Sequence, residues 1–186
     1  MKGLSILIPE YNCDCTQLVR DLHRQCASAL LPSWEIVVAD DGSIDETAVY
    51  QNRIIGTWDN CTFIRNEQNM GRAAIRNFLA EKAQYDRLLF IDSDMCIVSE
   101  DFVKTYLASS APVIYGGYSI VGNHAGNLRY EYERQAEHCH RASVRQRSCY
   151  KDFHTSNFCI DRSIFIAHPL DCLLYTSPSP RDTERS

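Results

Sequence analysis

Residues 87–95 read Arg-Leu-Leu-Phe-Ile-Asp-Ser-Asp-Met, and this stretch decides the fold. Residues 88–91 form a continuous apolar run that is too short for a buried helix, which is typical of a strand buried on both faces of a parallel sheet. The run ends in Asp92 and Asp94, and ligands of open α/β sheets bind outside the carboxyl ends of the strands. Because two acids in one place repel each other, we expect a divalent ion such as Mg²⁺ there, shared with a phosphorylated ligand.

Strand and helix patterns alternate along the chain, which predicts an α/β fold with a mostly parallel sheet and helices on both faces. The expected strands are residues 4–8, 35–39, 62–65, 87–91, 111–115 and 157–160. The expected helices are residues 15–30, a short one from Ser43 or Asp45 to about 51, then 71–83, 101–109 and 127–147, with a helical turn at 162–166. The first strand is expected to stop at Pro9, because proline cannot donate to a central ladder.

Composition narrows the class of protein. The chain has 186 residues and a net charge of −5, which argues against a protein that binds nucleic acid by neutralising phosphates. No apolar run approaches the roughly 20 residues that span a bilayer, and the run at 4–8 is too short for a signal-peptide core. We expect a cytoplasmic protein and leave peripheral membrane association open. Nine scattered cysteines, an odd number, argue against a disulfide framework and predict thiols that are mostly buried.

Three predicted strand ends are expected to line one crevice: residues 9–11, 40–41 and 92–94. Tyr11 can stack on a planar base, and the carboxylate of Asp40 can accept hydrogen bonds from an imide or a ribose. Gly71 opens a helix, where backbone N–H groups favour an anion, and Arg72 can pair with a phosphate. We therefore expect Asp40 and Asp94 to face one shared cleft.

These residues also have plainer interpretations. Asp92 and Asp94 could cap the next helix, residues 40–43 could form a simple turn, and Arg72 could be a solvated helix residue. Glu10 is better explained as loop surface than as a ligand.

Four motifs occur in order: SILIPEYN at 5–12, VADDGS at 38–43, NMGRAAIRN at 69–77 and FIDSD at 90–94. Together they resemble family 2 glycosyltransferases with the GT-A fold, and a looser likeness continues at 155–160.

The resemblance implies a nucleotide-sugar donor, most simply a UDP-sugar. Pro9 and Tyr11 would flank the base, Asp40 would hydrogen-bond it, Asp92 would touch the ribose, and Asp94 would hold Mg²⁺ or Mn²⁺ on the diphosphate. The hydroxyl of a glycan or lipid-linked acceptor would displace the nucleotide in line, with inversion at the anomeric carbon. The predicted nucleotide-sugar site comprises Pro9, Glu10, Tyr11, Asp40, Asp41, Gly71, Arg72, Asp92, Ser93 and Asp94, with Asp94 and Asp92 as metal ligands.

The C-terminal part departs from the family pattern. The family places its catalytic base in an acidic pair beyond the segment matched by 155–160. Because Asp171 comes too soon, the base is unassigned and is expected beyond residue 171. Residues 172–182 resemble the translation of a transposon-end sequencing adapter. We therefore expect residues 1–171 to be a GT-A domain that is incomplete at its acceptor half, and 172–186 to be a non-native tail.

Three alternatives remain open at this point. A phospho-acceptor receiver domain also has an acidic pair at a strand end, but here the pair follows the second strand instead of the first. A sugar-nucleotide nucleotidyltransferase requires a Gly-rich basic loop after the first strand, and residues 10–13 do not form one. The chain could also be an inactive fragment that only binds a nucleotide-sugar.

Overall fold

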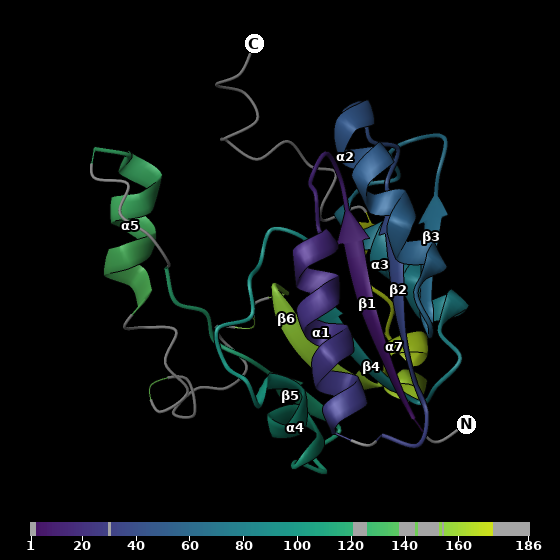
Figure 1. Cartoon of the computed structure of the whole chain (residues 1–186). Helices are drawn as coiled ribbons and strands as arrows, with labels where there is room; N and C mark the ends of the chain where they lie inside the picture. The colour runs from purple at the N-terminus through teal and green to yellow at the C-terminus, as the bar shows by residue number, and fades with distance from the viewer. Residues whose placement is uncertain are drawn as a thin grey trace.

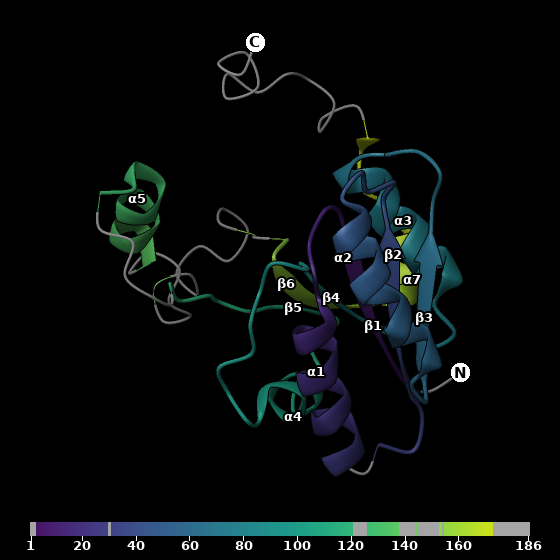
Figure 2. The ribbon, with the colours of Figure 1, turned by 45° about the horizontal axis from the view of Figure 1, so that its top comes forward.

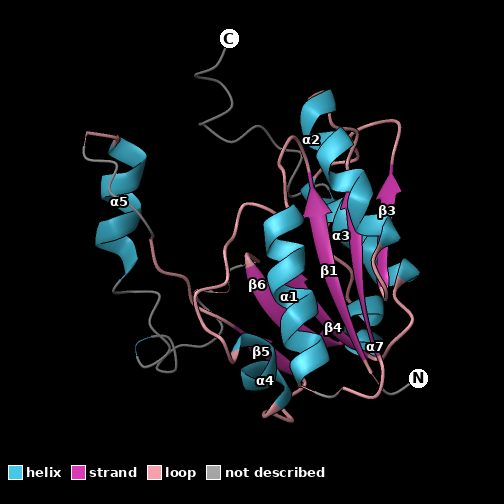
Figure 3. Cartoon of the chain, in the orientation of Figure 1, coloured by secondary structure: helices cyan, strands magenta, loops and turns pink. Residues whose placement is uncertain are grey.

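The described part of the chain forms a six-stranded sheet in the order β3-β2-β1-β4-β6-β5, in which β6 runs antiparallel to both of its neighbours, β4 and β5 (Figures 1 and 3). The computed structural model describes residues 3–29, 31–120, 126–137, 144, 153 and 155–172. The strands are β1 (Leu4–Glu10), β2 (Trp34–Asp40), β3 (Cys61–Arg65), β4 (Arg87–Ile91), β5 (Val113–Tyr115) and β6 (Asn157–Asp161). The helices are α1 (Thr16–Ser28), α2 (Glu46–Asn52), the 3₁₀ helix η1 (Arg53–Thr57), α3 (Arg72–Lys82), α4 (Phe102–Leu107), α5 (Leu128–Ala136) and α7 (Arg162–Ala167).

Helices cover both faces of the sheet, as the sequence predicts, and the turned view in Figure 2 separates the layers. On one face, Leu22 of α1 and Val103 of α4 pack against Ile6, Ile36 and other strand residues. On the other face, α3 and α7 pack against the strand residues that alternate with these. Since successive residues of a strand point to opposite faces, strands covered twice must be apolar throughout.

Strand β4, which begins the stretch 87–95, is an example of a strand buried on both faces. Leu89 packs in the α1 layer, whereas Leu88 and Phe90 pack in the α3 layer, and all three are fully buried. The ring of Phe90 stacks on those of Phe158 and Phe165, with centroids 4.7 and 4.9 Å apart. The prediction of a strand buried on both faces is therefore confirmed.

Strand β1 runs two residues further than predicted, through Pro9 to Glu10. Its pairing with β4 ends at Leu7, while its pairing with β2 continues to the end of the strand. The last residues of β1 thus have a sheet neighbour on one side only, where a proline is tolerated as it is on an edge strand.

The helix predicted from Ser43 or Asp45 is capped by Asp45, whose carboxylate accepts from the N–H groups of Thr47 and Ala48. The 3₁₀ helix η1 that follows was not predicted. The helix expected at 127–147 is described only in part: residues 128–136 form α5, and residue 144 is also described. Residues 138–143 and 145–147 lie outside the described part. Of the expected tail at 172–186, only Cys172 is described.

Two further expectations concern the described residues. Their cysteines are free thiols, as expected, but the expectation that most are buried is wrong for the described ones. Three are buried (Cys15, Cys26 and Cys159), and four are partly or fully exposed (Cys13, Cys61, Cys96 and Cys172). None of the helices in the described ranges combines the length and apolarity needed to cross a membrane.

Replacement of Phe90 by alanine tests the packing under the site. We expect Phe90→Ala to lower the free energy of unfolding by about 3–5 kcal/mol, because it leaves a cavity between two stacked rings. Urea denaturation followed by circular dichroism measures this. Tyr50→Ala, which truncates a side chain that is 77% exposed, is the control and should change the free energy of unfolding by less than about 1 kcal/mol. Equal effects of the two substitutions would contradict the packing described here.

Candidate functional site

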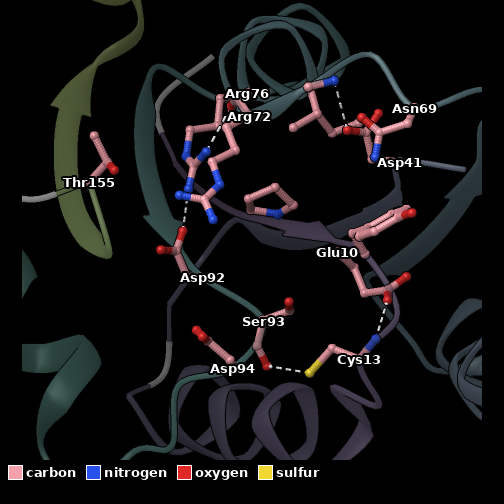
Figure 4. Close-up of a pocket in the computed structure, with 14 residues that line it drawn as sticks. Glu10, Cys13, Asp41, Asn69, Arg72, Arg76, Asp92, Ser93, Asp94 and Thr155 are labelled. Carbon is pink, nitrogen blue, oxygen red and sulfur yellow. Dashed lines mark hydrogen bonds and ion pairs between the residues drawn. The ribbon is translucent and has the colours of Figure 1, made fainter. Parts of the chain in front are cut away.

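A cavity of about 480 Å³ opens where β1, β2 and β4 end and α3 begins (Figure 4). Of the predicted site, the lining includes Pro9, Glu10, Tyr11, Asp41, Gly71, Arg72, Asp92, Ser93 and Asp94. It also includes five residues that were not predicted: Cys13, Asn69, Ile75, Arg76 and Thr155. Asp40 is the one predicted residue outside the lining.

Asp40 faces away from this cavity. It is completely buried, its Oδ1 accepts from Ser43 N at 2.7 Å, and its Oδ2 lies 3.5 Å from Arg65 Nε. The expectation that Asp40 and Asp94 share one cleft is therefore wrong for this structure. In β2, Ile36 and Val38 point to the α1 side, and Asp40 continues their alternation.

Asp41 takes the place that was expected for Asp40. It follows Val37 and Ala39 of β2, which point to the α3 side, and its carboxylate reaches the loop before α3. The two carboxylate oxygens accept from Met70 N at 2.8 Å and Gly71 N at 3.0 Å. Burial raises the pKa of Asp41, while these two hydrogen bonds lower it. Asp41 thus fixes the start of α3 beside the cavity.

Two glycines allow the turn after β2 to lie close to the loop before α3. Gly71 has a φ of +88°, a left-handed conformation that side chains disfavour. Gly42 has a φ of +74°, and a Cβ there would lie 2.7 Å from Asn69 N. The turn after β2 can therefore lie against the loop that leads into α3.

Glu10 is buried, so its interpretation as loop surface is wrong. Its carboxylate accepts from Cys13 N at 2.7 Å and from Ser43 Oγ at 3.3 Å. Burial raises its pKa to about 7, and the nearby charge of Asp40 adds to the rise, while the hydrogen bond from Cys13 opposes it. Glu10 therefore joins the loop after β1 to the turn after β2.

Two asparagines that sequence reasoning missed hold the loop that carries Tyr11. Asn12, with a φ of +52°, accepts through Oδ1 from Ile44 N and Asp45 N, both at 2.9 Å. Asn52 is fully buried, accepts from Cys15 N at 3.0 Å and donates to Cys13 O at 2.8 Å. Asn12 lies inside one of the quoted motifs, but nothing in the sequence indicates the role of Asn52. The result is a fixed loop with the Tyr11 ring about half exposed at the cavity.

The basic wall of the cavity comprises Arg72 and Arg76, both on α3 (Figure 4). Arg72 is exposed, whereas the side chain of Arg76 is only 7% exposed. Arg76 Nη1 donates to Arg72 O at 2.7 Å, and Nη2 forms an ion pair with Asp92. Residues four apart share one face of a helix, and that spacing was the signal that could have identified Arg76.

Next to this wall lies the loop that follows β4, residues 92–94. Burial raises the pKa of Asp92, although the charges of Arg76 and Arg72 lower it. The carbonyl of Ser93 accepts from Cys13 Sγ at 3.5 Å, which joins this loop to the loop after β1. Asp94 is exposed at the cavity.

A divalent ion fits this set of donors only in part. Among the described residues, no group of three or more His, Cys, Asp or Glu side chains is placed to hold a metal. Mg²⁺, however, is commonly bound by one or two carboxylates together with phosphates of the substrate. Asp94 is the more available ligand, because Asp92 is already paired with Arg76.

The raised pKa of Glu10 predicts how stability changes with pH. Between pH 4.5 and about 7, the folded protein keeps a proton that the unfolded chain loses, so the free energy of unfolding falls as pH rises through this window. Glu10→Gln should remove this slope and should gain up to about 3 kcal/mol relative to wild type between pH 4.5 and 8. Urea denaturation at several pH values measures the difference. The exposed Glu100→Gln is the control, and a pH-independent difference for Glu10→Gln would contradict the assignment.

Comparison with known proteins agrees with this geometry. Residues 5–166 match the family described as Glycosyl transferase family 2. An uncharacterized glycosyltransferase of Haemophilus influenzae is 35% identical over 126 residues, which cover 64% of this chain and 48% of the relative. This chain thus spans about half the length of that relative.

Two solved structures share the fold at low identity. S. aureus TarS 1-349 in complex with UDP-GlcNAc has a TM-score of 0.56 and 20% identity, over 89% of this chain and 46% of that one. Mannosyltransferase PcManGT from Pyrobaculum calidifontis, in complex with GDP-Man and Mn²⁺, has a TM-score of 0.57 and 17% identity, over 92% and 48%. The expected GT-A architecture is confirmed, and the chain belongs to glycosyltransferase family 2.

Proposed function

We propose that this chain is the donor-binding part of a glycosyltransferase. It would transfer a sugar from a nucleotide-sugar, in the first instance a UDP-sugar, to a hydroxyl of a glycan or lipid-linked acceptor, with inversion at the anomeric carbon. The observation that carries the proposal is one cavity whose lining combines Asp92 and Asp94, which follow β4, with Arg72 and Arg76 of α3. Family membership supports it independently.

Each wall of the cavity suits one part of such a donor. Tyr11, on its fixed loop, presents a half-exposed ring that a uracil base can stack on. Arg72 is exposed beside the cavity and can pair with phosphate oxygens through two parallel hydrogen bonds. The N–H of Gly71 is already bound by Asp41, so in this arrangement the anion must use Arg72 instead of that N–H.

The role proposed for Mg²⁺ or Mn²⁺ is confined to the diphosphate. An ion held by Asp94 would neutralise the charge that develops on the departing nucleotide. The Mn²⁺ and GDP-Man named for PcManGT, and the UDP-GlcNAc named for TarS, support a nucleotide-sugar site of this kind.

Several earlier predictions stay predictions within this proposal. These are the catalytic base beyond residue 171, the acceptor, the cytoplasmic location and the peripheral membrane association. Binding without transfer by this chain also remains a prediction. The family assignment replaces the two other classes considered, a receiver domain and a nucleotidyltransferase.

Calorimetric titration tests the proposal. We expect UDP and UDP-sugars to bind more tightly with Mn²⁺ than in EDTA, and we expect Asp94→Ala to remove that metal-dependent gain of about tenfold or more, equivalent to about 1.4 kcal/mol. The matched control is Asp101→Ala, because the carboxylate of Asp101 is 70% exposed and lies outside the cavity lining. Failure of uracil and guanine nucleotides alike to bind the wild-type chain would refute the proposal. An unchanged metal-dependent gain in Asp94→Ala would remove Asp94 from the site.

A further inference from the structure

Arg76 joins two elements that line the cavity, α3 and the end of β4. Its Nη1 donates to the backbone carbonyl of Arg72 at 2.7 Å, in the first turn of α3. Its Nη2 is paired with the carboxylate of Asp92, directly after the end of β4. Arg72 and Asp94, the groups proposed to hold the diphosphate, lie at either end of this connection (Figure 4).

The burial of Arg76 is unusual for a charged side chain. The side chain is 7% exposed, and its Nε has no hydrogen-bond partner within the described residues. A buried guanidinium is costly unless its geometry is well paired, so such groups often serve to specify one arrangement of the chain instead of adding stability. The planar fork of arginine can hold a carbonyl and a carboxylate at once in a fixed geometry, which lysine cannot reproduce.

The same pairing affects what Asp92 can bind. One oxygen of its carboxylate is engaged by Arg76, and Arg72 lines the same cavity. A divalent cation at Asp92 would therefore meet two guanidinium groups of the same sign of charge. Asp94 is exposed, and no ion pair between it and either arginine is found among the described residues.

We infer that Arg76 is a positioning residue for the diphosphate of the donor: it holds the first turn of α3, with Arg72, at a fixed separation from the loop that carries Asp94. Asp92 is the counter-ion of Arg76 in this arrangement, and Asp94 alone supplies the carboxylate for the metal ion. The inference rests on the proposed function. It adds that recognition of the diphosphate, as distinct from the nucleoside, depends on a residue that is itself almost inaccessible to the ligand.

The test compares ligands that differ only in their number of phosphate groups. Uridine, UMP and UDP are titrated calorimetrically into wild type, Arg76→Gln, Arg76→Lys and Asp92→Asn, each with Mn²⁺ and in EDTA. We expect Arg76→Gln to reduce the ratio of UDP to UMP affinity by about tenfold or more and to change uridine affinity less than twofold. Arg76→Lys should restore part of the ratio, because one ammonium can pair with Asp92 but cannot hold the carbonyl of Arg72 as well.

The Asp92→Asn variant distinguishes the role of Asp92 from that of Asp94. We expect this variant to lower UDP affinity in EDTA, as Arg76→Gln does, and to keep the gain from Mn²⁺. Arg24→Gln removes an arginine whose side chain is 72% exposed and is absent from the cavity lining, and it should leave all three affinities unchanged. Circular dichroism establishes that each variant is folded. If Arg76→Gln does not fold, Arg76→Lys and Asp92→Asn decide the question by the same ratios.

Three results would overturn the inference. The first is an unchanged ratio of UDP to UMP affinity in Arg76→Gln and Arg76→Lys. The second is a parallel loss of uridine affinity, which would show that Arg76 supports the domain generally. The third is loss of the Mn²⁺ gain in Asp92→Asn, which would make Asp92 a metal ligand. Absence of any uridine-nucleotide binding by wild type would instead refute the proposed function, and this inference would fall with it.

Discussion

Four carboxylates line the cavity at one edge of the sheet, and the structure of the site depends on how each of these charges is compensated. Glu10 accepts hydrogen bonds from Cys13 and Ser43, Asp41 accepts two from the loop before α3, and Asp92 is paired with Arg76. Asp94 is left exposed at the cavity. Each compensated carboxylate also joins two segments, so the interactions that neutralise the acids are the ones that shape the cavity.

The architecture of the sheet explains why the acids meet at all. Parallel strands β1, β2 and β4 are neighbours, and their carboxyl ends lie at the same edge. Apolar packing on both faces holds these strands in register, with Phe90 of β4 stacked between rings of β6 and α7. The same packing buries Glu10 and Asp41 at this edge and leaves Asp92 partly exposed. The raised pKa values of Glu10, Asp41 and Asp92 are a consequence of that burial.

The two sides of the cavity have different chemical tasks in the function proposed here. The loop after β1 offers a ring surface for the base, and the start of α3 with the end of β4 offers charge for the diphosphate. Such a division places nucleoside recognition on the loop after β1, which Asn12 and Asn52 hold, and diphosphate recognition on α3 and β4, which Arg76 joins. Asn52 and Arg76 are buried, and their roles depend on contacts with residues that are distant in sequence, so they were not in the predicted site.

The sequence by itself determined the order of strands and helices, the burial of β4 on both faces, the edge where the site lies and the family, because these follow from local apolar patterns and motif order. Only the tertiary structure decided that Asp41 and not Asp40 lines the cavity, that Glu10 is buried and that Arg76 pairs with Asp92. Asp41 and Gly71 are 30 residues apart, and Arg76 and Asp92 are 16 apart. Contacts at such separations depend on how strands and helices pack against each other, and local patterns carry no information about them. The choice between Asp40 and Asp41 is a partial exception, because the alternation of β2 already assigns the two side chains to opposite faces once the neighbouring helices are known.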